Sequence, residues 1–151
     1  MPPKTHQIWN TQFISHIIDS MADGVFTLDD QGYITSWNYA MERISGYPAD
    51  EALGKTCQLL QCSRCFGKQC PASIKKCAIL EHGKSEAKEC LLKHKDGHTV
   101  PLIKNASVVR DDDENIIGIG MKCRAKTFSM GYLMSSNITL SKYTLPFNLC
   151  L

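Results

Sequence analysis

Five of the chain's eight cysteines fall within one short segment, where their thiols are close enough in sequence to act together. The five are Cys57, Cys62, Cys65, Cys70 and Cys77. The Cys62-x2-Cys65 spacing lets two thiolates hold one metal ion or one iron of a cluster. Cys70 is followed by Pro71, and the cysteine runs of some iron–sulfur proteins end in a similar Cys-Pro pair, although with a different spacing. The segment therefore predicts a thiolate site for zinc or an iron–sulfur cluster.

Three interpretations of these thiols remain open from sequence. In the first, Cys62, Cys65 and Cys70 bind a metal, with Cys77 or Cys57 as the fourth ligand. The spacing does not separate zinc from an iron–sulfur cluster, because both take four soft ligands. In the second, the thiols form and break disulfides in response to redox state. In the third they only fill space, since cysteine is among the most buried residue types.

Composition narrows the classes of protein that the chain can belong to. Its 151 residues are 43% hydrophobic, enough for one domain with one core. The 17 basic and 15 acidic residues are dispersed, with a net charge of +2, so no basic stripe predicts nucleic-acid binding. Neither a signal peptide nor an apolar run of about 18 residues is present, which predicts a cytoplasmic protein without a membrane span. A reducing cytoplasm favours metal binding or redox chemistry over structural disulfides.

The N-terminal 22 residues predict an amphipathic helix. Their apolar side chains recur at steps of three and four, which places them along one face of a helix. These side chains are Phe13, Ile14, Ile17, Ile18 and Met21. Such a stripe needs a partner surface, and we expect it to pair two copies of the chain in a homodimer.

The rest of the chain predicts five strands interrupted by small helices. A hairpin is expected from "GVFTLDD" and "YITSWN", followed by the helix "YAMERIS", which Asn38 caps and Gly46 ends. Short helices are expected at "ADEAL" and at "ASIKKCAILEH", the second carrying Cys77. Three strands follow, at "EAKECLLKHK", "TVPLIKNASVVRD" and "IIGIGMKCRA". This order predicts an α+β domain over 23–127, with an antiparallel sheet and helices on one face, and a tail of uncertain structure over 128–151.

The phrases "GVFTLDDQGYITSWNYAMERISGYPADEALGK" and "KHKDGHTVPLIKNASVVRDDDENIIG" together resemble the PAS family of sensory domains. This resemblance implies a five-stranded antiparallel sheet cupped over small helices, used for sensing or dimerisation. The cysteine-rich middle is similar to PAS domains of bacterial enhancer-binding transcriptional regulators and sensor kinases. Their output domain is not expected in this chain.

Two other cofactors of PAS domains are not expected. "GKTCQLLQ", with Cys57, resembles the photoactive-cysteine motif of the light-oxygen-voltage branch, which binds flavin. The strand positions that carry amide side chains in that branch hold Leu92, Leu102 and Cys123 here, so the polar edge of a flavin has no partners. His82 falls on the helix that carries the haem ligand in some PAS oxygen sensors, but charged neighbours predict a solvated helix end.

No nucleophile, base and orienting group assemble in the sequence, and no phosphate-binding glycine loop is present, which predicts a protein that is not an enzyme. The sequence thus favours a sensory PAS module that responds to redox state or oxygen through the cysteine segment. The competing hypothesis is a PAS interaction module that dimerises without any cofactor.

Overall fold

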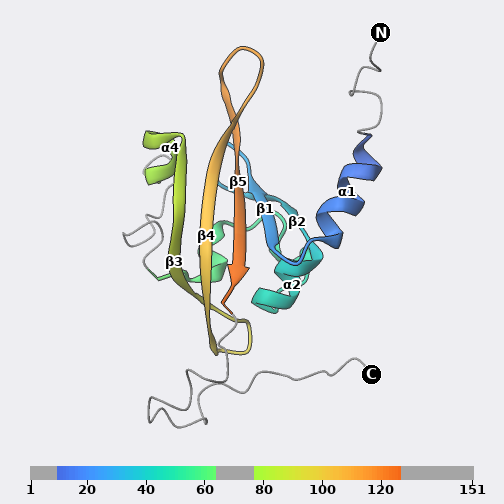
Figure 1. The fold of residues 1–151 in the computed structure, drawn as a ribbon, viewed down its shortest axis with the longest axis vertical. Coiled ribbons are helices and arrows are strands. Elements are labelled where there is room, and N and C mark those ends of the chain that lie inside the picture. The colour runs from blue at the N-terminus through green and yellow to red at the C-terminus, as the bar shows by residue number, and fades with distance from the viewer. Residues whose placement is uncertain (1–9, 64–76, 127–151) are drawn as a thin grey trace.

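The computed structural model describes residues 10–63 and 77–126 (Figure 1). Ten elements follow one another in this part of the chain. They are α1 (Thr11–Ser20), β1 (Gly24–Leu28), β2 (Ile34–Trp37), α2 (Tyr39–Ser45), α3 (Ala49–Ala52), the 3-10 helix η2 (Cys57–Leu60), α4 (Ala78–His82), β3 (Lys84–Lys93), β4 (Thr99–Arg110) and β5 (Ile116–Ala125). The expected α+β fold with five strands and small helices is confirmed.

The five strands form one sheet in the order β2-β1-β5-β4-β3, and every neighbouring pair is antiparallel. β1 lies between its hairpin partner β2 and the last strand: Phe26 pairs with Trp37 on one side and with Met121 on the other. In Figure 1, α1 lies beside the β1–β2 edge and α4 beside β3, and the turn between β4 and β5 projects beyond the rest of the sheet. Hairpins connect all neighbouring strands except β1 and β5. The pairing of these two joins the first two strands of the chain to the last three.

One face of the sheet is buried, because side chains alternate across each strand. On β1 the side chains of Phe26 and Leu28 are buried, and on β5 those of Ile119 and Met121. The helices contribute to the same core cluster. Their buried members are Met41 of α2, Ala52 of α3, Leu60 of η2 and Ile79 of α4. The small helices therefore pack on this one face, as the sequence predicts.

A buried asparagine ties the N-terminal helix to the domain. The Asn38 side-chain oxygen accepts hydrogen bonds from the backbone amides of Met41 (3.0 Å) and Val25 (2.8 Å), so it caps α2 and holds the start of β1. Its amide nitrogen donates to the carbonyl oxygens of Ile18 (2.9 Å) and Asp23 (3.1 Å). A movement of α1 is thereby linked through one side chain to both the sheet and α2.

The amphipathic helix predicted over residues 1–22 is present at Thr11–Ser20, with most of its apolar stripe exposed. Residues 1–9 and the tail over 128–151 lie outside the described residues. Phe13, Ile14 and Ile17 are 41%, 39% and 38% exposed, values unusual for large apolar side chains. Asn10 caps the helix by accepting a hydrogen bond from the Phe13 amide at 2.8 Å. Within the described residues no helix is both long and apolar enough to cross a bilayer.

An ion cluster fastens the segment between α1 and β1 to the last strand. The Asp23 carboxylate accepts hydrogen bonds from Arg124 at 3.0 and 3.1 Å and lies 2.9 Å from the Lys122 ammonium. The hydrogen bonds from Arg124, and next those from Lys122, lower the pKa of Asp23 from 3.8 to about 2. The ionised carboxylate is therefore stabilised only in the folded protein.

This cluster predicts a specific loss of stability in acid. Because the folded pKa of Asp23 lies below the unfolded one, its stabilisation is complete above pH 3.8 and disappears as the pH falls towards 2. Arg124 is largely exposed, and solvent screening leaves about 1 kcal/mol of the effect. Urea unfolding at pH 6 should show Asp23→Asn to be less stable by about that amount. Near pH 2 the variant and the parent chain should converge, and a constant difference between them would contradict this assignment.

Candidate functional site

The described cysteines all belong to one part of the molecule, the core on the inner face of the sheet. Cys77, Cys90 and Cys123 are buried members of the core cluster. Cys57 and Cys62 are half-buried and pack against the same cluster. The expected core positions of Cys90 on β3 and Cys123 on β5 are confirmed. Cys65 and Cys70 lie outside the described residues.

The start of the cysteine segment is fixed by hydrogen bonds to two strands. The Ile34 amide of β2 donates to the Lys55 carbonyl at 2.7 Å, just before η2 begins at Cys57. Gln61 ends η2 in the left-handed region, with φ 42°, and the Ser63 amide then donates to the Leu91 carbonyl of β3 at 2.9 Å. Residues 55–63 therefore span from one edge strand of the sheet to the other.

The far end of the segment is also attached to the core. Cys77 is buried and its backbone is extended, so it is the N-cap of α4 rather than a residue of the helix. Its carbonyl accepts a hydrogen bond from the Leu80 amide at 3.0 Å, which starts α4 at Ala78. The sequence-based placement of Cys77 within a helix is wrong by one residue. The earlier part of that predicted helix, 72–76, lies outside the described residues.

The three described candidate ligands do not form a metal site by themselves. In residues 10–63 and 77–126, Cys57, Cys62 and Cys77 are not part of any three-ligand group with its donor atoms close enough to hold one ion. A site made of Cys62, Cys65, Cys70 and Cys77 thus depends on the two thiols outside this range and stays a prediction. The three-ligand group that these ranges do contain lies in the β3–β4 turn.

A buried lysine lies beside one of these cysteines, and the sequence patterns did not identify it. Lys104 of β4 is 2% exposed and pairs directly with Cys123 of β5. Its ammonium lies 6.0 Å from the centre of the Phe26 ring. The signal was present in the sequence, because strand alternation places Lys104 on the same face as Leu102 and Ala106. A cation at this position favours anions on the inner face, including thiolates.

The inner face does not match the polar edge of a flavin. Leu92, Leu102 and Cys123 are at most 1% exposed and belong to the core, so the three positions face inward as the register predicts. None of them carries the amide group that a flavin's buried donors and acceptors need. Cys57, the counterpart of the photoactive thiol, is half-buried at the first position of η2. His82 is exposed at the end of α4, as expected of a solvated helix end.

Comparison with known families identifies the class of protein. The sequence profile of the PAS fold matches residues 12–125, about three quarters of the chain. The chain therefore belongs to the PAS family, and the match begins inside α1 and ends at the last residue of β5. PAS domains are typically non-enzymatic sensory or signalling modules. A search of curated proteins finds no match to this chain.

Solved structures show the same fold. A PAS domain from Colwellia psychrerythraea is 22% identical with a TM-score of 0.61, covering 77% of this chain and 96% of that one. The PAS domain of nitrogen regulation protein NR(II) from Vibrio parahaemolyticus is 19% identical with a TM-score of 0.58, covering 75% of this chain and 97% of that one. An RNA-binding light-oxygen-voltage receptor is 20% identical with a TM-score of 0.60, covering 83% of this chain but 36% of that one.

Proposed function

We propose that this PAS domain senses redox state or oxygen through its cysteine segment. Cys62, Cys65, Cys70 and Cys77 would hold an iron–sulfur cluster or zinc, with Cys57 as the alternative fourth ligand. The observation that carries the proposal is the attachment of the segment at both ends: Cys57 and Cys62 pack against the same core that contains Cys77. Oxidation or loss of metal at these thiols would therefore alter the packing of the core.

The buried charge of Lys104 supports a site that carries negative charge. Four thiolates around one metal leave a net negative site, and isolated anions are costly to bury. The Lys104 ammonium lies on the same inner face, where it would partly offset such charge. An iron–sulfur cluster would supply sensitivity to oxidation, whereas zinc would hold the thiolates until they are oxidised.

Transmission of the signal has a physical route in the chain. A stimulus shifts a protein between two packings only if it interacts with them unequally. Met41 belongs to the core against which Cys57 and Cys62 pack, and its amide is held by Asn38. Asn38 also holds the Ile18 carbonyl of α1. A change in packing near the cysteines is thus passed to the N-terminal helix and from there to a partner.

The test compares matched cysteine variants purified without air. The parent chain should contain iron with sulfide, or zinc, near one site per chain, with visible absorption in the iron–sulfur case. Cys62→Ser/Cys65→Ser should lose the bound species, because two of the four ligands are gone. The control is Cys90→Ser, which alters a buried core thiol outside the segment and should keep the species while the protein becomes less stable.

A colourless, metal-free parent chain whose properties do not change on oxidation would overturn the proposal. In that case the alternative function, a PAS interaction module without a cofactor, would be favoured. The exposed stripe on α1 is the observation that supports this alternative. The same stripe also serves a sensor that signals by dimerisation.

We further propose that α1 pairs with α1 of a second copy through Phe13, Ile14 and Ile17. Ile17→Glu should convert the dimer to a monomer, because it places a charge in the apolar stripe. Gln12→Glu adds the same charge to an exposed position outside the stripe and should leave the dimer intact. Light scattering coupled to size-exclusion chromatography measures both. A parent chain that is monomeric at high concentration, or a dimeric Ile17→Glu, would contradict this pairing.

A further inference from the structure

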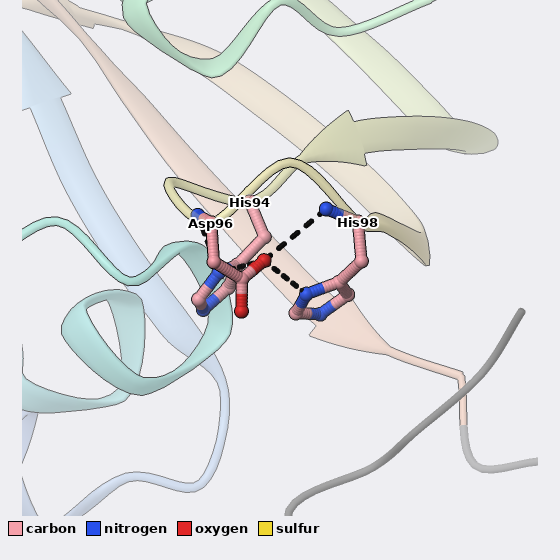
Figure 2. Close-up of side chains that lie close together, drawn as sticks. All are labelled: His94, Asp96 and His98. Atoms are coloured by element: carbon pink, nitrogen blue, oxygen red, sulfur yellow. Dashed lines mark hydrogen bonds and ion pairs between the residues drawn. The ribbon is translucent and has the colours of Figure 1, made fainter.

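The β3–β4 turn brings two histidines and an aspartate together. The His94 amide donates to the His98 carbonyl at 2.8 Å, which closes the turn, and Gly97 takes the left-handed backbone that the reversal requires, with φ 101°. Residues 94, 96 and 98 then lie on the same side of the turn (Figure 2). The Asp96 carboxylate accepts a hydrogen bond from the His98 amide at 3.1 Å, which fixes its orientation.

Both imidazole rings present the same nitrogen to one carboxylate oxygen. His94 Nδ1 lies 3.0 Å from Asp96 Oδ1, and His98 Nδ1 contacts the same oxygen (Figure 2). The two rings stack with their centres 4.3 Å apart and their planes 23° apart. The stacked rings and the carboxylate therefore converge on one small region of the turn.

The arrangement calls for a proton or a cation between the ligand atoms. The Asp96 amide donates to His94 Nδ1 at 3.2 Å, so this nitrogen serves as an acceptor in the turn. Two atoms with lone pairs, such as His94 Nδ1 and Asp96 Oδ1, repel each other at 3.0 Å unless a proton or a cation lies between them. The rest of the turn does not supply one: the Lys95 ammonium is directed to Glu51, 2.6 Å away.

We propose that His94, Asp96 and His98 form a second, surface site for a divalent metal of the zinc class. Two imidazoles and a carboxylate are a usual donor set for Zn²⁺, at about 2.0–2.2 Å from the ion. Donors of a tetrahedral ion lie roughly 3.3 Å apart, so His94 and Asp96 must separate by a few tenths of an ångström and the closer pair, Asp96 and His98, by more. Asp96 is 63% exposed and can make that movement, with a small rotation of the His98 ring. Three protein ligands leave the fourth position open to water or an exchangeable group.

The turn packs against the ends of α2 and α3, so an ion bound there would also affect how these helices are held. The His94 ring lies against Gly46 at the end of α2, so closely that a Cβ on Gly46 would be 2.3 Å from the ring. The Lys95 amide donates to the Ser45 carbonyl at 2.9 Å, and the Lys95 ammonium pairs with Glu51 of α3. An ion held by His94 and His98 would therefore rigidify a turn that packs against the corner between α2 and α3.

The experiment titrates the full chain with Zn²⁺ and follows the histidine ring signals by NMR. We expect the signals of His94 and His98 to shift together and saturate, while those of His82 and His16 do not move. Calorimetric titration then compares variants in the Cys62→Ser/Cys65→Ser background, so the thiolate site of the proposed function does not contribute. The result is independent of whether the thiolate site exists, because the NMR readout is specific to the turn.

His98→Asn and Asp96→Asn should each weaken Zn²⁺ binding by about tenfold or more, since even outer-shell partners of a metal are worth roughly 10–100-fold. His82→Asn removes an exposed histidine elsewhere and should change affinity less than about twofold. The site is overturned if the His94 and His98 signals stay still up to about 1 mM Zn²⁺. It is equally overturned if His98→Asn and Asp96→Asn bind as the background does while remaining folded by circular dichroism.

Discussion

Replacing Asn38 with alanine should lower the free energy of unfolding by about 3–4 kcal/mol. The side chain is 2% exposed and makes four hydrogen bonds to backbone groups of three different segments. Alanine leaves the amides of Val25 and Met41 and the carbonyls of Ile18 and Asp23 without these partners. A buried polar group that loses its partner costs about 1–3 kcal/mol, and water reaches some of the four.

Chemical denaturation measures this loss, and Asn10→Ala is the matched control. Asn10 caps α1 through the same kind of bond, to the Phe13 amide, but it is exposed and binds no other segment. Its loss should cost about 1 kcal/mol or less, because only the cap is removed. Asn38→Asp tests the accepted and the donated hydrogen bonds separately. It keeps the oxygen that accepts from Val25 and Met41, but it replaces the amide nitrogen with a second oxygen, which repels the Ile18 and Asp23 carbonyls. Equal effects of Asn38→Ala and Asn10→Ala would contradict the bridging role of Asn38.

The local elements were predictable because their signals are local. Asn38 followed by a short helix and Gly46 gave α2 with its observed bounds, since the cap and the left-handed glycine are encoded in neighbouring residues. Alternating apolar residues located the strands, although β3 begins at Lys84, two residues before its predicted start. The amphipathic helix was also found, and the exposed side chains of its stripe agree with the expectation that it needs a partner surface.

The site was less predictable because it depends on contacts between distant residues. His94 and His98 flank a hairpin turn, yet both are partly buried, because the turn folds back against Gly46 and Ser45. The sequence spacing of two between His94, Asp96 and His98 resembles a strand pattern and does not reveal a shared oxygen. Lys104 was missed for a different reason: a charged residue within an apolar strand is usually assigned to the solvent face.

The two glycines of β5 allow a sharp test of how β1 and β5 fit together. Gly118→Ala should destabilise the domain by about 1–3 kcal/mol, towards the upper end, because the new Cβ would lie 2.5 Å from the Leu28 carbonyl oxygen. That atom belongs to the backbone of β1, where Leu28 pairs with Ile119. A backbone oxygen cannot move aside as the end of a flexible side chain can. The clash is therefore removed only if β1 itself shifts.

Gly120→Ala is the matched control, two residues along the same strand. Its Cβ would lie 3.8 Å from Ser107 Oγ, an ordinary contact, and alanine restricts the unfolded chain more than glycine does. This variant should be neutral or more stable by up to about 1 kcal/mol. Thermal unfolding of both variants gives the comparison directly. If Gly118→Ala were as stable as Gly120→Ala, the end of β1 would not be held against β5 as described.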